Sequence, residues 1–314
     1  MMKRIAPYQE MSSLDNYRNL AEELFTILDF YRFAVSLAAH KDIYYGHGTD
    51  NPMDEFAFLI LESLGLPYEY PSEKWLARLT KTERLLLAQQ LYARIEQHIP
   101  APYLVNKAYF CGIPFYVNEA VLIPRSPIAE LIEKHFAPWV DEYAVTQILD
   151  LCTGSGCIAA AMSFAFPEAM VDAIDIDASA LQVAQKNITD LGLDQSVCLI
   201  QSDGFDALNT EVYDIIVSNP PYVGAAEMQT LPSEYLHEPQ IALQAKQNGL
   251  DLVHRILQQA AKHLKPHGIL VVEVGNSYVE VIKAYPELPF IWLDFEHGGH
   301  GVFLLEAKDL PKWS

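Results

Sequence analysis

Apolar positions follow a helical period in the N-terminal part of the chain. They recur at spacings of three and four residues, which places them on one face of a helix. This pattern predicts a helix over residues 12–40, a second from Met53 to Leu64 and a third that begins near Thr80. Thr80 and Glu83 have the spacing of a capping box, which stabilises a helix N-terminus. We therefore expect a helical N-terminal domain.

Prolines mark where this helical part ends. Ile99-Pro100-Ala101-Pro102 cannot continue the preceding helix, because proline has no amide hydrogen to donate. Residues 108–117 form two short apolar runs about Gly112, which predicts a β-hairpin, and a helix is expected from Ile128 to Phe136. The expected domains are residues 1–98 (helical), residues 99–125 (a linker with the hairpin) and residues 126–314 (an α/β domain).

From residue 146 the period changes to short apolar runs that alternate with helical segments. Strands are predicted at residues 147–151, 170–174, 197–201, 213–217, 268–274, 290–295 and 301–306, and helices near 157–165, 178–190 and 249–264. Such alternation is typical of a mainly parallel sheet covered by helices. Only residues 296–300 separate the last two strands, so these should form an antiparallel hairpin at one edge. The expected fold class is α/β with a Rossmann-like sheet.

Composition narrows the class of partner. The formal net charge is −20, which disfavours sequence-independent binding to duplex DNA, because that affinity comes from lysine and arginine contacts to phosphates. The charge favours a basic partner, although it can also serve solubility alone. No segment sustains the roughly 18 apolar residues of a membrane span, and the four cysteines have no zinc-site spacing. We expect a cytoplasmic protein with free thiols and no membrane partner.

A turn with two glycines follows the first strand of the α/β region. Asp150-Leu151-Cys152-Thr153-Gly154-Ser155-Gly156 opens a helix, and its glycines let a ligand approach the backbone closely. Asp175 ends the second strand, where a carboxylate can accept two ribose hydroxyls. Ala159 stands where a dinucleotide fingerprint has its third glycine, so a nucleoside without a pyrophosphate, such as S-adenosylmethionine (AdoMet), fits as well. Candidate cofactor-binding residues are Asp150, Thr153, Gly154, Ser155, Gly156, Asp175, Asp203, Phe205 and Asn219, with Asp203 and Phe205 expected beside the adenine.

Asn219-Pro220-Pro221-Tyr222 follows the fourth predicted strand. Its two prolines fix φ and donate no backbone hydrogen bonds, so the loop should be rigid. We interpret it as a clamp, in which the side-chain oxygen of Asn219 and the carbonyl of Pro220 accept both hydrogens of a substrate amide and aim its nitrogen at a methyl group. Tyr222 is expected to pack over the planar group. The candidate catalytic residues are Asn219, Pro220 and Tyr222, and the candidate substrate-binding residues are Asn219, Pro220, Pro221, Tyr222 and Arg125.

These motifs together resemble the class I AdoMet-dependent methyltransferases that modify an amide or exocyclic amino nitrogen. Pro102-Tyr103-Leu104, Leu122-Ile123-Pro124-Arg125 and Glu238-Pro239 extend the similarity to the HemK branch, the protein-glutamine methyltransferases, over nearly the whole chain. The resemblance implies AdoMet as cofactor, a helical N-terminal domain for substrate recognition and an acceptor glutamine held at Asn219 and Pro220. Arg125 either reaches the acceptor or the cofactor carboxylate, or pins the linker to the catalytic domain. Lys246-Gln247 departs from the branch, which more often has glycine and aspartate there.

Three further stretches separate two versions of this branch. Tyr45-Gly46-His47-Gly48-Thr49, Arg125-Ser126-Pro127 and His297-Gly298-Gly299-His300-Gly301 resemble the version that methylates the third protein of the large ribosomal subunit, rather than the version that acts on release factors. The partner implied is that basic ribosomal protein, before or during assembly. The release-factor activity, DNA adenine-amino methylation and a catalytically silent AdoMet-binding assembly protein are the alternatives. The loop histidines lack a third ligand at suitable spacing, so no metal is expected.

Overall fold

The computed structural model describes residues 11–245 and 250–311, and it divides into two compact units. The first unit comprises Met1–Lys107 together with Pro232–His237, and the second comprises Ala108–Leu231 and Glu238–Ser314. The β-hairpin therefore belongs to the second unit. The division into residues 1–98, 99–125 and 126–314 stays a prediction.

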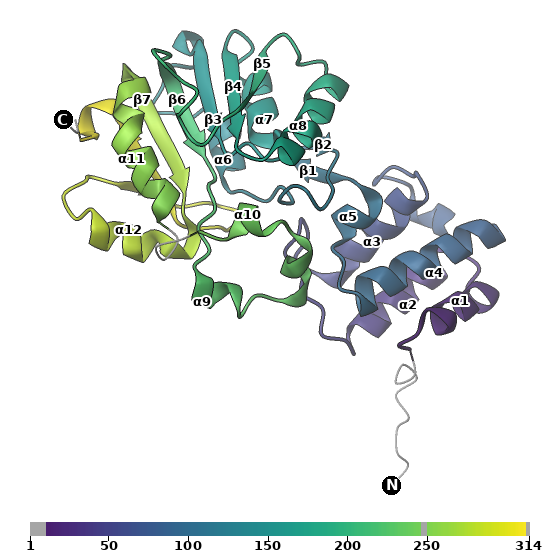
Figure 1. The fold of residues 1–314 in the computed structure, drawn as a ribbon. Helices are drawn as coiled ribbons and strands as arrows, with labels where there is room; N and C mark the ends of the chain where they lie inside the picture. Colours follow the sequence, from purple (N-terminus) through teal and green to yellow (C-terminus); the bar gives the residue numbers. More distant parts are fainter. Residues whose placement is uncertain (1–10, 246–249, 312–314) are drawn as a thin grey trace. The chain divides into compact units, whose positions relative to one another are not determined.

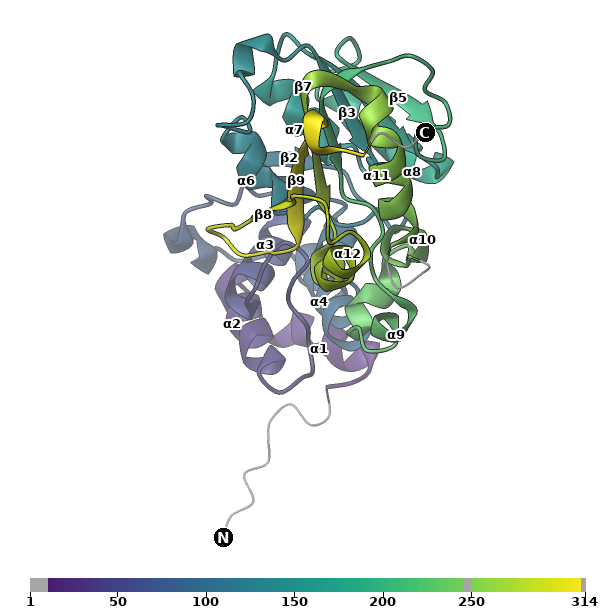
Figure 2. The same cartoon turned by 90° about the vertical axis from the view of Figure 1, so that its left-hand side faces the viewer.

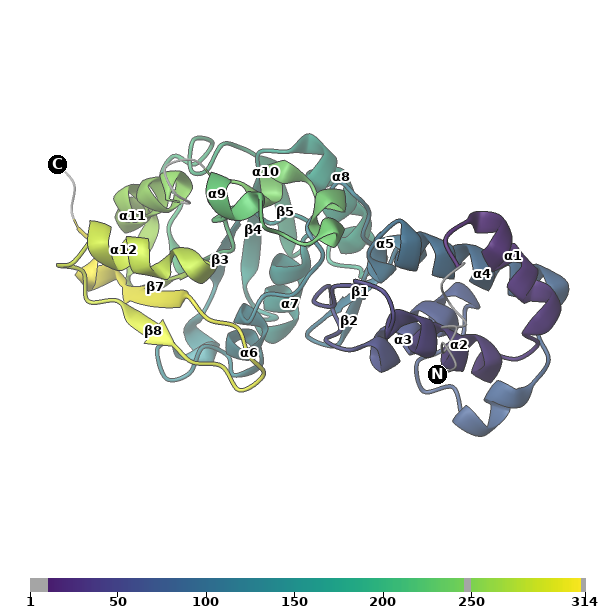
Figure 3. The same ribbon diagram turned by 90° about the horizontal axis from the view of Figure 1, so that it is seen from below.

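The first unit is helical, as the apolar period predicts (Figure 3). Its helices are α1 (Leu14–Glu23), α2 (Ile27–Ala38), α3 (Pro52–Ser63), α4 (Lys81–Glu96) and α5 (Ala101–Val105), with short 3₁₀ turns η1 (Ser72–Leu76) and η3 (Ser233–His237). Their apolar faces meet in one core, whose fully buried members include Phe30, Leu37, Phe56, Leu59 and Leu91.

The predicted single helix over residues 12–40 is wrong, because Thr26 starts a new one. The Thr26 hydroxyl accepts the amide of Asp29, and the Asp29 carboxylate accepts the amide of Thr26, so the two side chains form a capping box. The capping box predicted at Thr80 and Glu83 is confirmed at the start of α4.

The second unit begins with the predicted hairpin, formed by β1 (Ala108–Phe110) and β2 (Ile113–Phe115). Helix α6 (Ile128–Glu133) ends three residues before the predicted bound. His135 and Phe136 have φ values of 50° and 53°, which a right-handed helix cannot contain.

A seven-stranded sheet forms the centre of this unit, in the order β5-β4-β3-β6-β7-β9-β8 (Figure 1). Its strands are β3 (Gln147–Leu151), β4 (Met170–Asp175), β5 (Val197–Gln201), β6 (Tyr213–Ser218), β7 (Leu264–Glu273), β8 (Ile291–Leu293) and β9 (Val302–Glu306). Strands β3 to β7 run parallel, whereas β9 is antiparallel to both β7 and β8. The mostly parallel sheet and the antiparallel edge hairpin are thus confirmed.

Alternating side chains of the strands form two cores, one on each face. Ile148 packs with α6 and α7, whereas its neighbour Leu149 packs with α11, because successive strand residues point to opposite faces. Figure 2 shows the sheet between these helices. The helices of this unit are α6, α7 (Cys157–Ala165), α8 (Ala178–Asp190), α9 (Ala225–Met228), α10 (Gln240–Leu243), α11 (Asp251–His263) and α12 (Tyr278–Ala284), with 3₁₀ turns η2 (Glu142–Ala144), η5 (Gly275–Ser277) and η6 (Ala307–Asp309).

The strand order reverses direction between β3 and β6. From β3 the chain proceeds outward through β4 to β5, and then crosses to β6 on the other side of β3. Leu151 is paired with Ser218, so the loops that follow these two strands start side by side at the same sheet edge. Open α/β sheets bind ligands at such a switch point.

Candidate active site

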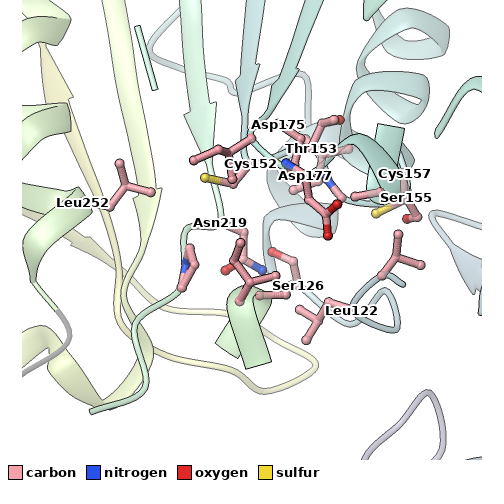
Figure 4. Close-up of a pocket in the computed structure, with 18 of the residues that line it drawn as sticks. Leu122, Ser126, Cys152, Thr153, Ser155, Cys157, Asp175, Asp177, Asn219 and Leu252 are labelled. Carbon is pink, nitrogen blue, oxygen red and sulfur yellow. Dashed lines mark hydrogen bonds between the residues drawn. The ribbon is translucent and has the colours of Figure 1, made fainter. Parts of the chain in front are cut away.

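A cavity of about 430 Å³ lies at the carboxyl ends of the parallel strands (Figure 4). Loops after β3, β4, β5 and β6 contribute to it, as do the linker after the hairpin and the start of α11. Of the predicted site residues, it is lined by Arg125, Thr153, Gly154, Ser155, Asp175, Asp203, Asn219 and Pro221. The sequence motifs therefore converge on one cavity.

The glycine turn after β3 depends on left-handed backbone conformations. Gly154 and Gly156 have φ values of 54° and 79°, and the Gly156 amide donates to the Thr153 carbonyl over 2.9 Å. A Cβ atom at Gly156 would lie 3.2 Å from the Cβ atom of Ala184 on α8. This glycine therefore permits the turn and also the close approach of α8.

Asp150 supports this turn from beneath and does not line the cavity. The side chain is fully buried, and its Oδ2 atom accepts the Thr153 hydroxyl over 2.7 Å and the Ala159 amide over 3.1 Å. Its Oδ1 atom has no hydrogen-bond partner among the described residues. Burial raises the pKa of Asp150 to about 7. The structure thus corrects the expectation of a direct cofactor contact, because strand β3 points this carboxylate inward.

Asp175 joins the ends of two loops at the cavity wall. Its carboxylate accepts the amide of Gly154 over 2.8 Å and the amide of Asp177 over 2.9 Å. Burial raises the pKa of this carboxyl above its ordinary value, while the two amide donors oppose that shift. Each oxygen keeps a second lone pair for a ligand hydroxyl. The position suits the predicted contact with a ribose.

Asp203 and Phe205 follow the same strand but have different environments. Asp203 lines the cavity and accepts Arg255 Nη1 at 2.6 Å, so a cation from α11 holds it. Phe205 is buried in the core and stacks on His263 with ring centroids 5.1 Å apart. The expectation that Phe205 lies beside the adenine is therefore corrected, because this ring packs under the sheet and does not reach the cavity.

Asn219 is the first residue of the loop after β6, and it lines the cavity (Figure 4). Its carboxamide makes no hydrogen bond with the residues that the structure describes, and neither does the carbonyl oxygen of the buried Pro220. Both prolines lack amide hydrogens, so the loop cannot satisfy these acceptors internally. Asn219 thereby offers an oxygen acceptor to the cavity, whereas the predicted partner Pro220 is buried and is not among the residues that line the cavity.

Tyr222 is held away from the cavity by the end of β7. Its hydroxyl donates to Glu273 over 2.9 Å, and a Cβ atom at Gly275 would lie 2.5 Å from its ring. The other oxygen of Glu273 accepts the Ser126 hydroxyl over 2.6 Å. Burial raises the pKa of Glu273, although these two hydroxyl donors oppose the shift. Tyr222 and Ser126 are therefore fixed to one buried carboxyl, and Tyr222 is not among the residues that line the cavity.

Arg125 lines the cavity, and both of its Nη atoms bind the buried Glu238. The distances are 2.6 Å to Oε1 and 2.7 Å to Oε2, which is a bidentate ion pair. Its Nη1 atom also donates to the carbonyl of Ile123. Of the two roles expected for Arg125, this geometry supports pinning of the linker.

Sequence reasoning missed Glu273 and Arg255 as parts of the site. Glu273 ends an apolar strand, and Arg255 lies on one face of α11, so neither belongs to a short motif. Glu273 could have been noticed because it is a charged residue at the carboxyl end of a buried strand. Glu238 was noticed only within a resemblance, without a partner.

The histidines of the β8–β9 connection do not form a metal site with other described residues. His300 Nε2 lies 2.8 Å from Asn276 Oδ1, and both His297 and His300 are exposed. Within residues 11–245 and 250–311 no group of three or more histidine, cysteine, aspartate or glutamate side chains could hold a metal ion.

In the same ranges no helix is long and apolar enough to cross a membrane. The departure at Lys246-Gln247, with Asn248-Gly249, lies outside the described residues.

Comparison with known proteins gives one family model and close full-length relatives. Residues 133–246 match the methyltransferase small domain. The chain is 41% identical to the ribosomal protein uL3 glutamine methyltransferase of Francisella tularensis over 304 residues, covering 96% of this chain and 97% of the relative. It is 45% identical to the Neisseria meningitidis protein of the same name over 295 residues, covering 94% and 97%. A T. thermophilus 16S rRNA methyltransferase solved with AdoMet and guanosine has a TM-score of 0.45 at 18% identity, over 64% of this chain and 49% of that chain.

Proposed function

This chain belongs to the family of ribosomal protein uL3 glutamine methyltransferases, and we propose that it methylates the side-chain amide nitrogen of a glutamine in uL3 with AdoMet as methyl donor. The fold is that of a class I methyltransferase, and the protein is a protein-glutamine methyltransferase. The identity of about two residues in five spans nearly the full length of both proteins. That extent covers the helical unit as well as the catalytic one.

The observation that carries this proposal is the oxygen acceptor of Asn219 on the cavity that also holds Asp175, with the carbonyl of Pro220 as the next acceptor along the same loop. A primary carboxamide has two N–H donors on one nitrogen and no other reactive hydrogen. Two acceptors on one rigid loop can bind both donors and fix the amide plane. A hydroxyl substrate has only one O–H donor, so it would leave one of the two acceptors of this loop without a hydrogen bond.

AdoMet fits the residues that line the cavity. Asp175 offers two carboxylate lone pairs to the ribose hydroxyls, while the turn at Gly154 lets the amino-acid part approach the backbone. Asp203 and Ile176 line the part of the cavity next to Asp175, where the adenine would lie. When bound, AdoMet supplies a methyl group on a sulfonium, and the leaving group is a neutral thioether.

Asn219 and Pro220 act on the acceptor nitrogen during transfer. A carboxamide nitrogen is a weak nucleophile, because its lone pair is delocalised into the carbonyl. Hydrogen bonds from its two N–H groups to Asn219 Oδ1 and Pro220 O stabilise the positive charge that develops on the nitrogen. As the new C–N bond forms, one of these two protons is lost to water, so that a neutral N-methyl carboxamide remains. The oxygens are fixed before the reaction, so their orientation costs little at that moment.

The expected partner is uL3 in the cytoplasm, before or during ribosome assembly. Ribosomal proteins are basic, and the net charge of −20 on this chain favours their approach. The same charge opposes the binding of DNA, which an adenine-amino methyltransferase would need. The names of the relatives also favour uL3 over a release factor.

The decisive experiment mixes the purified protein with methyl-labelled AdoMet and one of three acceptors. These are unmethylated uL3, an unmethylated release factor and duplex DNA. We expect label on one glutamine side chain of uL3, located by mass spectrometry, and little on the other acceptors. The Asn219→Ala variant serves as the catalytic blank. Label on the release factor or DNA but not on uL3 would overturn the proposal, as would no transfer to any acceptor.

A further inference from the structure

The loop that carries the clamp continues into a segment of the helical unit. The active-site loop, residues 219–245, starts with Asn219 and ends with Ala242, Gln244 and Ala245, which line the cavity. Its base is closed by backbone hydrogen bonds between Val223 and Leu243 and between Ala245 and Val223. Between these two ends, Pro232–His237 belongs to the first unit. The middle of the active-site loop therefore belongs to the helical unit, whereas residues at both of its ends line the cavity.

Glu234 anchors that segment through a buried ion pair with Arg94 of α4. Both side chains are almost fully buried, and Arg94 Nη1 lies 3.0 Å from Glu234 Oε1. The same oxygen accepts the amide of Tyr44 over 3.0 Å and lies 3.2 Å from His98 Nδ1. Burial opposes ionisation of Glu234, but these donors hold its pKa below the ordinary value. The carboxylate is thus charged and specifically bound.

Arg94 is itself fixed by the loop that bears the unexplained Tyr45-Gly46-His47-Gly48-Thr49 motif. Its Nη2 atom donates to the Tyr44 carbonyl over 2.7 Å, and its Nε atom donates to Glu55. The Thr49 hydroxyl binds the second oxygen of Glu55 at 3.1 Å. A buried arginine between two carboxylates has its donors satisfied on several sides, which makes its position well defined.

Aromatic side chains of the Tyr44–Thr49 loop pack on the residue next to Glu234. His47 and Tyr44 lie against Tyr235, with ring centroids 4.8 Å and 5.6 Å apart. A Cβ atom at Gly46 would lie 2.7 Å from the Tyr44 ring, so glycine leaves room for this arrangement. His237 Nε2 lies 3.0 Å from the Gln97 carbonyl at the end of α4. Residues 234–237 are therefore held by contacts with α4 and with the Tyr44–Thr49 loop, both of the helical unit.

We propose that Arg94, Glu234 and the Tyr44–Thr49 loop form a latch that positions the active-site loop, so that the helical unit sets the placement of Asn219 and of the cavity wall near Ala245. The residues of the latch act as positioning residues, and none of them is among the residues that line the cavity. This inference rests on the proposed methyl transfer to uL3. It gives the motif at Tyr45–Thr49 a role within the enzyme.

The test compares Glu234→Gln with the matched control Glu96→Gln. Glu96 also lies on α4 and pairs with Lys41, but it does not contact the segment. Because a small misplacement of reacting groups slows transfer strongly, we expect Glu234→Gln to lower kcat for uL3 about tenfold or more. The Kd for AdoMet, measured by calorimetry, should change by less than about twofold, because the cofactor part of the cavity is intact. The control should retain both values.

Hydrogen exchange supplies a readout that is independent of turnover. In Glu234→Gln, the amides of Tyr222, Val223 and residues 233–237 should exchange faster, while the sheet keeps its protection. Tyr235→Leu provides a second variant, because it loosens the segment without leaving a buried charge unpaired. Full kcat in a variant with faster exchange at residues 233–237 would overturn the latch, and so would unchanged exchange at Tyr222. A wild-type protein that methylates no uL3 would instead refute the proposed function, and the exchange at Tyr222 would then decide the latch alone.

Discussion

Asn219 is placed by the residues on either side of it. Ser218 ends β6, where its hydroxyl donates to the Leu151 carbonyl of β3 over 2.8 Å, and Pro220 and Pro221 fix the backbone that follows. The side chain therefore faces the cavity without forming a hydrogen bond to the described part of the chain. Its carboxamide has no evident packing role, so its replacement should affect the reaction more than the stability.

Replacing Asn219 with alanine tests this role directly. Loss of one group that stabilises the transition state should lower the rate of methyl transfer by about a hundredfold. Single-turnover kinetics with uL3 measure this step, and the melting temperature should stay close to that of the wild type. Gln229→Ala, an exposed change in the same loop, is the control and should keep full activity. Near-normal turnover of Asn219→Ala would exclude the clamp.

Asp150 makes stability depend on pH in an unusual direction. Its pKa is raised from 3.8 to about 7 in the folded protein, so the folded state binds a proton that the unfolded state releases in this range. Stability from this group is present below the unfolded pKa and is lost as pH rises towards the folded pKa. From pH 4 to 7 the loss should be on the order of 3 kcal/mol. Urea unfolding of wild type and Asp150→Asn should reveal this slope in the wild type alone, and parallel curves would contradict it.

Residues in short motifs could be predicted, whereas their partners could not. Asp175 and Asn219 each follow an apolar strand, so the sequence places them at the same sheet edge. The pairing of Arg125 with Glu238 joins positions 113 residues apart, and a single sequence contains no signal for it. Phe205 shows the same limit, because its aromatic character suits a cofactor pocket as well as the core, and only packing decides between them.

Element boundaries were predictable where apolar runs are continuous. β3, β5, α7 and α8 have the predicted bounds, since both strands are short and largely apolar and each helix is delimited by turn residues. The break between α1 and α2 was missed, although Thr26 and Asp29 already have capping-box spacing. The break was missed because apolar residues keep the helical spacing from α1 through the cap at Thr26 into α2. The anchoring of residues 232–237 in the helical unit depends on long-range contacts and has no local signature.

The β8–β9 connection supports the active site through its glycines. The carboxylate of Glu130 on α6 accepts the amides of Glu296 and His297, which fixes where the connection starts. At its other end, Val274 donates to the Gly301 carbonyl over 2.7 Å. Gly301 therefore lies against the turn that also packs on Tyr222. A Cβ atom at Gly299 would lie 2.7 Å from the Pro127 side chain, so two of the three stretches that distinguish this version of the branch meet in the structure.

Alanine at Gly301 should damage both stability and activity. Its φ is 71°, and a Cβ atom there would lie 2.1 Å from the Gly275 carbonyl oxygen, so the turn under Tyr222 must move. Gly298 is the matched control, because its φ is also positive, at 89°, but no atom lies within 4 Å of a Cβ there. We expect Gly298→Ala to cost about 1 kcal/mol from backbone strain alone. Gly301→Ala should cost several-fold more in denaturant unfolding and should reduce turnover, and equal costs would contradict this account.

At the scale of the whole molecule, we expect charge to influence the encounter with the substrate protein. The chain carries 41 acidic and 21 basic residues, and several basic ones are already paired, as Arg94 and Arg125 are. The unpaired excess is negative and therefore attracts a basic protein over distances comparable to the Debye length. AdoMet has a small net charge and gains little from this field.

Ionic strength should therefore separate the two substrates. Raising salt from about 50 to 300 mM shortens the Debye length more than twofold and should lower kcat/KM for uL3 by about threefold or more. The Kd for AdoMet should stay nearly constant, because its contacts lie within a cavity and do not depend on long-range attraction. Steady-state kinetics at several salt concentrations, with calorimetry in parallel, provide the measurement. At saturating uL3, kcat depends on the placement of the reacting groups in the bound complex and not on the rate of association. It should therefore not change with salt. A salt effect confined to kcat would show that charge acts on the bound complex and would contradict steering.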